Sequence, residues 1–253
     1  MTTEEKVTIS GGTEYDLIVP SAGGSEKVVS TDSTNTGTIT ITQGQDADKN
    51  DTVVVESTNA NDSITVTTTS NGQDVTVEQN YTTSEANTKL VISDKTDEVI
   101  LEQGGVNVPS NGSVTLPNGE VIENTSGSNG DDITVSVDNN GNKSVAIPGG
   151  GSANVGGTEI SVPNAEPANL PVDVELNNDG TLDVTAQSGN SVVIGGETYE
   201  IGDYNATFEV DPDAGEDAVP VVKEGTVVLQ PGQSITDSNG VTYTNPPVAA
   251  GEE

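Results

Sequence analysis

β-Branched side chains dominate the apolar residues of this chain. It holds 34 valines and 14 isoleucines against 8 leucines, and threonine adds another 33 residues. Such side chains are stiff at χ1 and pack well on the pleated surface of a strand, whereas they disfavour helices. The chain is therefore expected to be all-β, with little contribution from helix.

Apolar side chains are also scarce, which limits the core that the strands can bury. Valine, isoleucine, leucine and the single phenylalanine make up 57 of the 253 residues. That share is about 23%, just above the level of roughly 20% below which a highly charged chain is better described as disordered. We expect a folded protein with a thin core.

The chain is strongly acidic. Aspartate and glutamate total 41 against 7 basic residues, all of them lysines, and the formal net charge is -34. Nucleic acids and anionic membrane surfaces are bound through clustered cations, so neither is an expected partner. Metal cations and basic partners are the electrostatically natural companions of such a surface.

Several residue types that carry out chemistry are absent from the sequence. Without histidine or cysteine, Ser-His-Asp triads, Cys-His dyads and ordinary zinc sites cannot be assembled. Paired carboxylates remain available for a glycosidase mechanism, but carboxylates are plentiful on any acidic surface. The sequence thus predicts no enzymatic activity and no required cofactor.

No targeting segment stands out in the sequence. The first residues, MTTEEKVTIS, lack a basic region followed by an apolar run, and no stretch of about 18 apolar residues occurs. We expect no secretion signal and no membrane span in the chain as given. The expected location is extracellular, on a cell surface or a virion, reached as a mature fragment starting at Met1 or by assembly.

A short pattern recurs along the chain: two alternating apolar residues, a glycine-containing turn, and a closing Tyr or Ile. The last glycines of its final four copies are Gly119, Gly157, Gly196 and Gly240, at spacings of 38, 39 and 44 residues. This predicts a repeat of roughly 40 residues. Tyr15, Tyr199 and Tyr243 occupy equivalent positions, and we expect them to pack in the core or between repeats.

Residues 105–245 are predicted to form tandem β-modules. Asn140-Gly141 and Asp179-Gly180 supply the positive φ that a two-residue hairpin turn requires, and alternating apolar residues flank both turns. Further Asn-Gly pairs, such as Asn118-Gly119 and Asn239-Gly240, mark additional turns. Each module is expected to hold four short strands.

Residues 38–104 have a different pattern, in which apolar pairs recur every 9 to 15 residues beside Asn/Asp corners. One short strand per corner favours a β-solenoid or β-roll, and an antiparallel meander fits nearly as well. The expected fold class is thus an elongated all-β protein. Its segments are a β-hairpin segment at 1–37, the solenoid-like or meander region at 38–104, the tandem modules at 105–245 and a flexible tail at 246–253.

Strands such as Asp62-Ser63-Ile64-Thr65-Val66 resemble those of repetitive bacterial surface proteins and adhesins, and those of phage virion fibre or decoration proteins. The resemblance extends over roughly residues 38–245 and carries no catalytic motif. It implies a structural or adhesive role, with protein surfaces, self-assembly or glycans as partners. The Gly-Gly-x-Gly-x-Asp corner of calcium-binding nonapeptide rolls is absent.

Two acidic clusters are candidate metal sites. They consist of Asp46, Asp48, Asn50 and Asp51, and of Asp211, Asp213, Glu216 and Asp217. In the first cluster, oxygen ligands stand at alternate positions, as in loops that bind Ca²⁺, although the helices and loop glycine of an EF-hand are missing. Ca²⁺ is therefore the one ion that the sequence suggests, and solvated surface charge is the alternative.

The sequence as a whole predicts a non-enzymatic structural or adhesive surface protein: a stalk, a coat, or a virion fibre or decoration component. The alternative is a carbohydrate-binding or glycoside-processing β-solenoid. That alternative needs a groove with two converging carboxylates and stacking aromatic rings, which a spacer does not.

Overall fold

The computed structural model describes residues 5–10, 14–20, 26–32, 38–45, 51–69, 76–93, 98–127, 131–164, 170–214 and 219–248. Within these ranges the regular structure is β-strand, apart from one 3-10 turn, η1 (Pro212–Ala214). The all-β prediction is therefore confirmed. No helix in the described ranges has the length and apolar character that a membrane crossing requires.

The chain divides into two compact units. Unit 1 comprises Met1–Glu123 and Thr134–Gly141, and unit 2 comprises Asn124–Ile133 and the remainder from Asn142 to Glu253.

Unit 1 contains ten strands and most of two more. Their bounds are β1 (Glu5–Ser10), β2 (Glu14–Pro20), β3 (Glu26–Asp32), β4 (Thr38–Gln45), β5 (Asp51–Ser57), β6 (Ser63–Thr69), β7 (Thr76–Thr83), β8 (Thr88–Ser93), β9 (Val99–Val108), β10 (Ser113–Thr115), β11 (Val121–Asn124) and β12 (Ile133–Val137).

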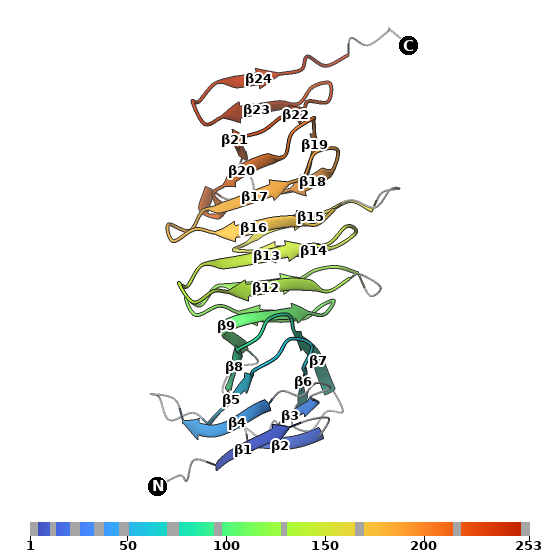
Figure 1. Ribbon diagram of the computed structural model, residues 1–253. Coiled ribbons are helices and arrows are strands. Elements are labelled where there is room, and N and C mark those ends of the chain that lie inside the picture. Colours follow the sequence, from blue (N-terminus) through green and yellow to red (C-terminus); the bar gives the residue numbers. More distant parts are fainter. Residues whose placement is uncertain are drawn as a thin grey trace. The chain divides into compact units, whose positions relative to one another are not determined.

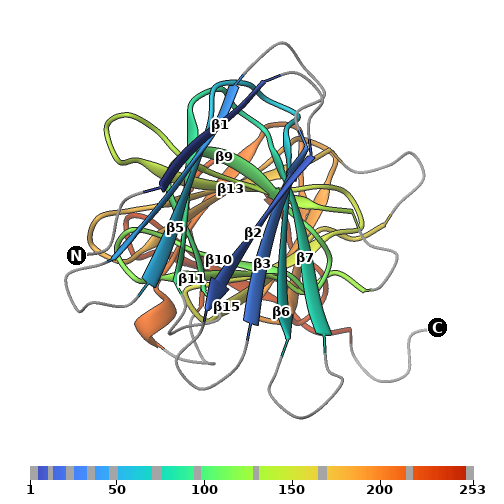
Figure 2. The ribbon, with the colours of Figure 1, turned by 90° about the horizontal axis from the view of Figure 1, so that it is seen from below.

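Strands β1 to β9 of unit 1 alternate in pairs between two sheets, in which these strands pair antiparallel; β10 then pairs with β9 in parallel at Thr115 and Ile100. The first sheet has the order β1–β4–β5–β8–β9. The second has the order β2–β3–β6–β7–β9. Figure 2 shows β1 and β5 on one side of unit 1 and β2, β3, β6 and β7 on the other.

Strand β9 belongs to both sheets. It pairs with β8 up to Gln103 and with β7 from Val106 onward. Gly104 has φ +82°, and a Cβ at this position would lie 2.5 Å from the Cα of Thr88. Because only glycine combines that backbone conformation with so close an approach, Gly104 allows the strand to cross from one sheet to the other.

A row of apolar side chains runs across the first sheet of unit 1. Ile41 faces Val55, Val55 faces Leu90, and Leu90 faces Leu101 in the strand register. All four side chains are buried. Since neighbours directly opposite in a sheet lie about 4.5–5.5 Å apart at Cβ, each strand supplies the next with a packed partner.

The apolar pairs predicted in residues 38–104 are buried where their side chains are described, as at Ile39/Ile41 and Leu90/Ile92. The strands pair antiparallel, with β5 next to β8 and β6 next to β3. These pairings do not confirm a solenoid with one strand per rung. They also differ from a simple meander, because successive pairs of strands join different sheets.

Unit 2 continues with twelve strands. Their bounds are β13 (Lys143–Ile147), β14 (Ser152–Val155), β15 (Thr158–Ser161), β16 (Val172–Leu176), β17 (Leu182–Ala186), β18 (Ser191–Ile194), β19 (Glu197–Ile201), β20 (Ala206–Val210), β21 (Val221–Glu224), β22 (Val227–Val228), β23 (Ser234–Asp237) and β24 (Thr242–Thr244).

The hairpins of unit 2 also alternate between two sheets. A short sheet has the order β14–β15–β18–β19–β22. A long sheet has the order β13–β16–β17–β20–β21–β23–β24, in which only the β21–β23 pair is parallel. The strands can be followed by their labels in Figure 1.

The long sheet of unit 2 carries an apolar row of its own. Val145, Val174, Val184 and Phe208 face one another in succession across four strands, and all four are buried. Phe208 also contacts Tyr199 of the short sheet, with ring centroids 5.2 Å apart and planes tilted by 48°. The two sheets of unit 2 therefore share one core.

The predicted Asp179-Gly180 turn joins β16 to β17. Gly180 has φ +91°, and Asp179 Oδ1 accepts hydrogen bonds from the hydroxyl and the backbone N–H of Thr181 at 2.8 and 3.1 Å. These bonds hold the pKa of the Asp179 carboxyl below its ordinary value. The hairpin prediction is confirmed at this turn.

Tyr81 is the largest fully buried side chain described in unit 1. Its hydroxyl donates a hydrogen bond to the carbonyl of Ser113 at 2.6 Å and lies against Gln79 Oε1. Burial raises the pKa of the Tyr81 phenol above its ordinary value. A raised folded-state pKa stabilises the fold fully below the unfolded pKa of about 10, and this contribution is lost as pH rises.

We therefore expect the wild-type protein to lose about 1.4 kcal/mol of unfolding free energy per pH unit above pH ~10 relative to Tyr81→Phe. Urea unfolding between pH 8 and pH 11 measures this difference. Parallel slopes for wild type and Tyr81→Phe would contradict the prediction.

Candidate functional site

Two adjoining pockets lie among the last strands of unit 2. The polar pocket has a volume of about 680 Å³ and is lined by Asp203, Tyr204, Asn205, Glu224, Gly225 and Thr226. The apolar pocket, of about 470 Å³, shares Gly225 and Thr226 and adds Val222, Val227, Leu229, Ile235, Asp237 and Tyr243. The shared residues make the two pockets one continuous surface.

The loop between β19 and β20 forms one wall of the polar pocket and is held by hydrogen bonds. The N–H of Tyr204 donates to Thr226 Oγ1 at 3.1 Å, and the N–H of Gly202 donates to the Thr226 carbonyl at 2.8 Å. On the other side, the N–H of Ser188 donates to Asn205 Oδ1 at 2.9 Å. The wall is thus fixed on two sides.

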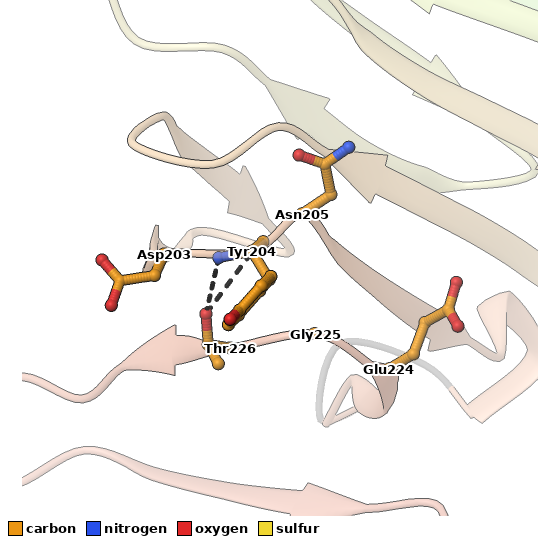
Figure 3. Close-up of a pocket in the computed structure, with 6 residues that line it drawn as sticks. All are labelled: Asp203, Tyr204, Asn205, Glu224, Gly225 and Thr226. Atoms are coloured by element: carbon orange, nitrogen blue, oxygen red, sulfur yellow. Dashed lines mark hydrogen bonds between the residues drawn. The ribbon is translucent and has the colours of Figure 1, made fainter.

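The Tyr204 ring is presented to solvent on this fixed wall, with 71% of the residue exposed. Figure 3 shows the ring in the middle of the pocket, over Thr226. The carboxylates of Asp203 and Glu224 lie on opposite sides of the pocket and point away from each other. The pocket therefore offers an aromatic face flanked by hydrogen-bond acceptors, rather than a converging pair of carboxylates.

Gly225 brings the two walls of the polar pocket together. Its φ is +98°, and a Cβ at this position would lie 2.0 Å from the carbonyl oxygen of Asn205 and 2.5 Å from the Cα of Ala206. Any larger residue would push the backbone of β20 away. The shape of the pocket therefore depends on this glycine.

A bulge in β21 directs a lysine across the outer face of the long sheet. The register of β20 and β21 shifts between Thr207 and Phe208, which leaves Lys223 as the extra residue. Lys223 Nζ lies 2.9 Å from Asp183 Oδ2 and 3.3 Å from Glu209 Oε2. Bonding to Asp183, and then to Glu209, raises the pKa of Lys223.

The apolar pocket is built around Ile235, which is buried and faces Tyr243 across the β23–β24 pair. Asp237 is the one charged residue in the lining of this pocket. Hydrogen bonds from the backbone N–H of Val241 and from that of Asn239, with a further one from the Tyr243 hydroxyl, hold the pKa of Asp237 below its ordinary value. Asp237 thus remains an anion that organises the β23–β24 turn.

Most of the residues predicted as metal ligands are not placed. Asp46, Asp48, Asn50, Glu216 and Asp217 lie outside the described residues, as does the side chain of Asp51. Asp211 and Asp213 flank the start of η1, where both are exposed, and the N–H of Asp213 donates to Asp211 Oδ1 at 3.0 Å. No group of three or more acidic side chains within the described ranges converges to hold a metal. Calcium binding stays a prediction.

Asp62 is a buried acidic residue of unit 1, and it is hydrogen-bonded to side chains of neighbouring strands. Asp62 Oδ2 accepts a hydrogen bond from the Ser57 hydroxyl, and the N–H of Asp62 donates to Thr83 Oγ1 at 2.9 Å. The Thr83 hydroxyl in turn donates to the carbonyl of Asn59 at 2.9 Å. Asp62 therefore ties the corner between β5 and β6 to the end of β7.

The tyrosines predicted to occupy equivalent positions differ in the structure. Tyr199 is 3% exposed, as expected, whereas Tyr243 is 52% exposed, so the packing prediction is wrong for Tyr243. The side chain of Tyr15 is outside the described residues. Sequence reasoning also missed Tyr204, whose only signal is an aromatic residue between two acceptors, Asp203 and Asn205.

Replacing Gly225 with alanine should destabilise the protein more than the same change at Gly180. Both glycines have positive φ, but the space beside Gly180 is open to a Cβ whereas the space beside Gly225 is filled. We expect Gly180→Ala to cost about 1–2 kcal/mol from backbone strain alone, and Gly225→Ala to cost clearly more. Urea unfolding compares the two variants, and equal costs would contradict the described packing at Asn205.

Comparisons with known proteins assign no family to this arrangement. No protein-family model, no curated protein and no solved structure matches the chain. Any role for the two pockets therefore rests on their own residues.

Proposed function

We propose that the protein is a non-enzymatic structural or adhesive component of a cell surface or virion, such as a stalk, coat, fibre or decoration protein. The observation that carries this proposal is the stepwise addition of hairpins in unit 2. Each hairpin pairs with the previous hairpin of its own sheet, at β13–β16, β15–β18, β17–β20 and β19–β22. The proposal requires no cofactor.

Stepwise addition of hairpins suits a spacer, because further hairpins lengthen the protein and leave the existing strand pairings unchanged. The two hairpins of the short sheet begin at Ser152 and Ser191, 39 residues apart. That spacing supports tandem modules of roughly 40 residues, each giving one hairpin to each sheet. In arrays of this type stability comes from nearest-neighbour contacts, and the length follows the number of repeats.

The outer face of the long sheet supports a surface location. In β16, the buried Val172, Val174 and Leu176 alternate with the exposed Asp173 and Glu175. This outward acidic face keeps copies apart and soluble. The divergent carboxylates of Asp203 and Glu224 (Figure 3) support a non-enzymatic role, since a two-carboxylate mechanism needs both groups at one reacting centre.

Nearest-neighbour stability makes a specific prediction for the core variant Phe208→Ala. Loss of the ring should cost about 3–5 kcal/mol and should speed amide hydrogen exchange mainly in β17, β20 and β21. The exchange in β4, β5 and β8 of unit 1 should stay near the wild-type level. Leu90→Ala in unit 1 is the matched control and should give the reverse pattern.

Hydrogen exchange that rises equally in both units for both variants would contradict the modular spacer. Turnover of an ester, peptide, phosphate or glycan would overturn the non-enzymatic assignment if it survived purification and disappeared in Glu224→Gln.

Binding of a neutral glycan is a second candidate function, and the exposed Tyr204 favours it. An aromatic face stacks on the apolar face of a sugar ring, and one of the carboxylates at the sides of the pocket, Asp203 or Glu224, can accept hydrogen bonds from hydroxyl groups of an oligosaccharide that extends over it. The net charge of -34 disfavours acidic polysaccharides. Neutral oligosaccharides are therefore the chemical class that the polar pocket fits.

Tyr204→Ala should weaken binding to a neutral oligosaccharide about two- to twelvefold, because an aromatic contact is worth about 0.5–1.5 kcal/mol. Tyr204→Phe keeps the ring and should retain most of the affinity. Titration followed by NMR over a panel of neutral oligosaccharides measures both effects. If no sugar binds, or if Tyr204→Ala binds as well as wild type, the polar pocket is not a glycan site.

A further inference from the structure

The last strands of unit 2 lie in a nearly uncharged part of an otherwise acidic chain. Residues 226–248 contain a single charged residue, Asp237, in a sequence with 41 acidic and 7 basic residues. This segment includes β22, β23 and β24, and several of its apolar side chains are exposed. They are Val228, Val241, Tyr243 and Val248.

Strand β24 has a free edge in the described part of the chain. It pairs with β23 on one side, and no other described strand pairs with it. Thr242, Tyr243 and Thr244 are all exposed.

The backbone groups of β24 that face this free edge follow from the ladder on its other side. Asn245 donates its N–H to the Gln233 carbonyl at 2.9 Å, and Val241 accepts from the N–H of Asp237 at 2.9 Å. Backbone groups alternate sides along an antiparallel strand. Thr242 and Thr244 therefore direct their N–H and C=O groups toward the free edge.

The side chains of this edge do not protect it against pairing with another strand. Soluble proteins protect edges by keeping the edge strand very short, or with charged side chains, prolines or bulges; of these, β24 has only its three-residue length. Thr242, Tyr243 and Thr244 are uncharged, and the neighbouring prolines, Pro246 and Pro247, lie beyond the strand. An uncharged edge of free backbone groups is a template for strand addition.

We propose that β24 pairs antiparallel with β24 of a second copy of this chain, about a two-fold axis at Tyr243. Thr242 of each copy then faces Thr244 of the other, and the two pairs exchange four backbone hydrogen bonds. The two Tyr243 residues face each other as a non-hydrogen-bonded pair, with Cα atoms about 4.5 Å apart. The interface is isologous, as in most dimers of identical chains.

The charge distribution favours a second copy as the occupant. Two chains that each carry -34 repel one another over most of their surfaces, so close approach is least opposed at the uncharged segment. A basic peptide would be drawn to the acidic faces, such as the one at Asp173 and Glu175, rather than to this edge. The inference rests on the proposed structural role, and it adds the partner, a second copy of the chain, and the strand through which the copies pair.

Cysteine cross-linking tests the proposed geometry directly, because the chain contains no cysteine. Tyr243→Cys should form a disulfide-linked dimer under mild oxidation, since a Cα separation of about 4.5 Å lies within the range that a disulfide spans. Val228→Cys, at an exposed apolar position in β22, is the matched control and should stay monomeric. Adding Thr242→Pro should abolish the Tyr243→Cys dimer, because it removes an edge N–H that β23 does not use.

Sedimentation of protein without introduced cysteines measures dimer formation while Tyr243 is unchanged. Wild type should form a dimer whose fraction increases with salt as charge repulsion is screened. Thr244→Lys should be monomeric, whereas Thr198→Lys, at an exposed site in β19, should behave as wild type. A wild-type monomer at all salt concentrations, or a Tyr243→Cys dimer no more abundant than that of Val228→Cys, overturns the proposal. Neither result alters the hydrogen-exchange test of the spacer.

Discussion

Cross-strand burial of short apolar rows is the interaction on which the rest of the structure depends. With few apolar residues, each strand turns only two or three side chains inward, as Val172, Val174 and Leu176 do in β16. Such a strand buries little alone, and its neighbour in the row completes the contact. The same alternation sends the acidic residues outward, so a thin core and a net charge of -34 can coexist in one fold.

Charged side chains and backbone conformation determine features of the long sheet that the buried apolar rows do not specify. Glu175, Asp183 and Glu209 face one another across the outer side of the long sheet, where like charges opposite each other are unfavourable. Lys223 reaches Asp183 and Glu209 because the bulge in β21 directs it there. Gly225, two residues further on, admits the backbone of Asn205, so one short segment both relieves repulsion and shapes the polar pocket.

Local features of the fold were predictable from the sequence, whereas the choice of strand partners was not. The Asp179-Gly180 turn and its flanking alternation are encoded within about 15 residues, and they form the predicted hairpin. The pairing of β5 with β8 joins segments separated by two strands of the other sheet, and no pattern within either strand specifies that choice.

The candidate site was harder to predict, because the exposure of a side chain depends on which strands lie next to its own strand in the sheet. Tyr199 and Tyr243 share a sequence pattern, but β19 is covered by β18 and β22 whereas β24 is covered only by β23 among the described strands. Tyr204 lies in a loop outside any periodic pattern, so neither its exposure nor its nearness to Glu224 is visible in the sequence. The acidic cluster at Asp46 shows the converse: a clear local pattern whose side chains are not described.

The passage of β9 through both sheets of unit 1 has a mechanical consequence. A load that pulls the two sheets apart acts on this strand through the backbone at Gly104, where φ is +82° and Thr88 lies in close contact, as well as on the connections that join the sheets. Strand β9 is paired with β8 before Gly104 and with β7 after it, so each sheet holds a different part of the strand. Separation of the two sheets at β9 therefore requires one of these two ladders to break, and the shorter one, with β7, is the two-pair ladder at Val106 and Asn107.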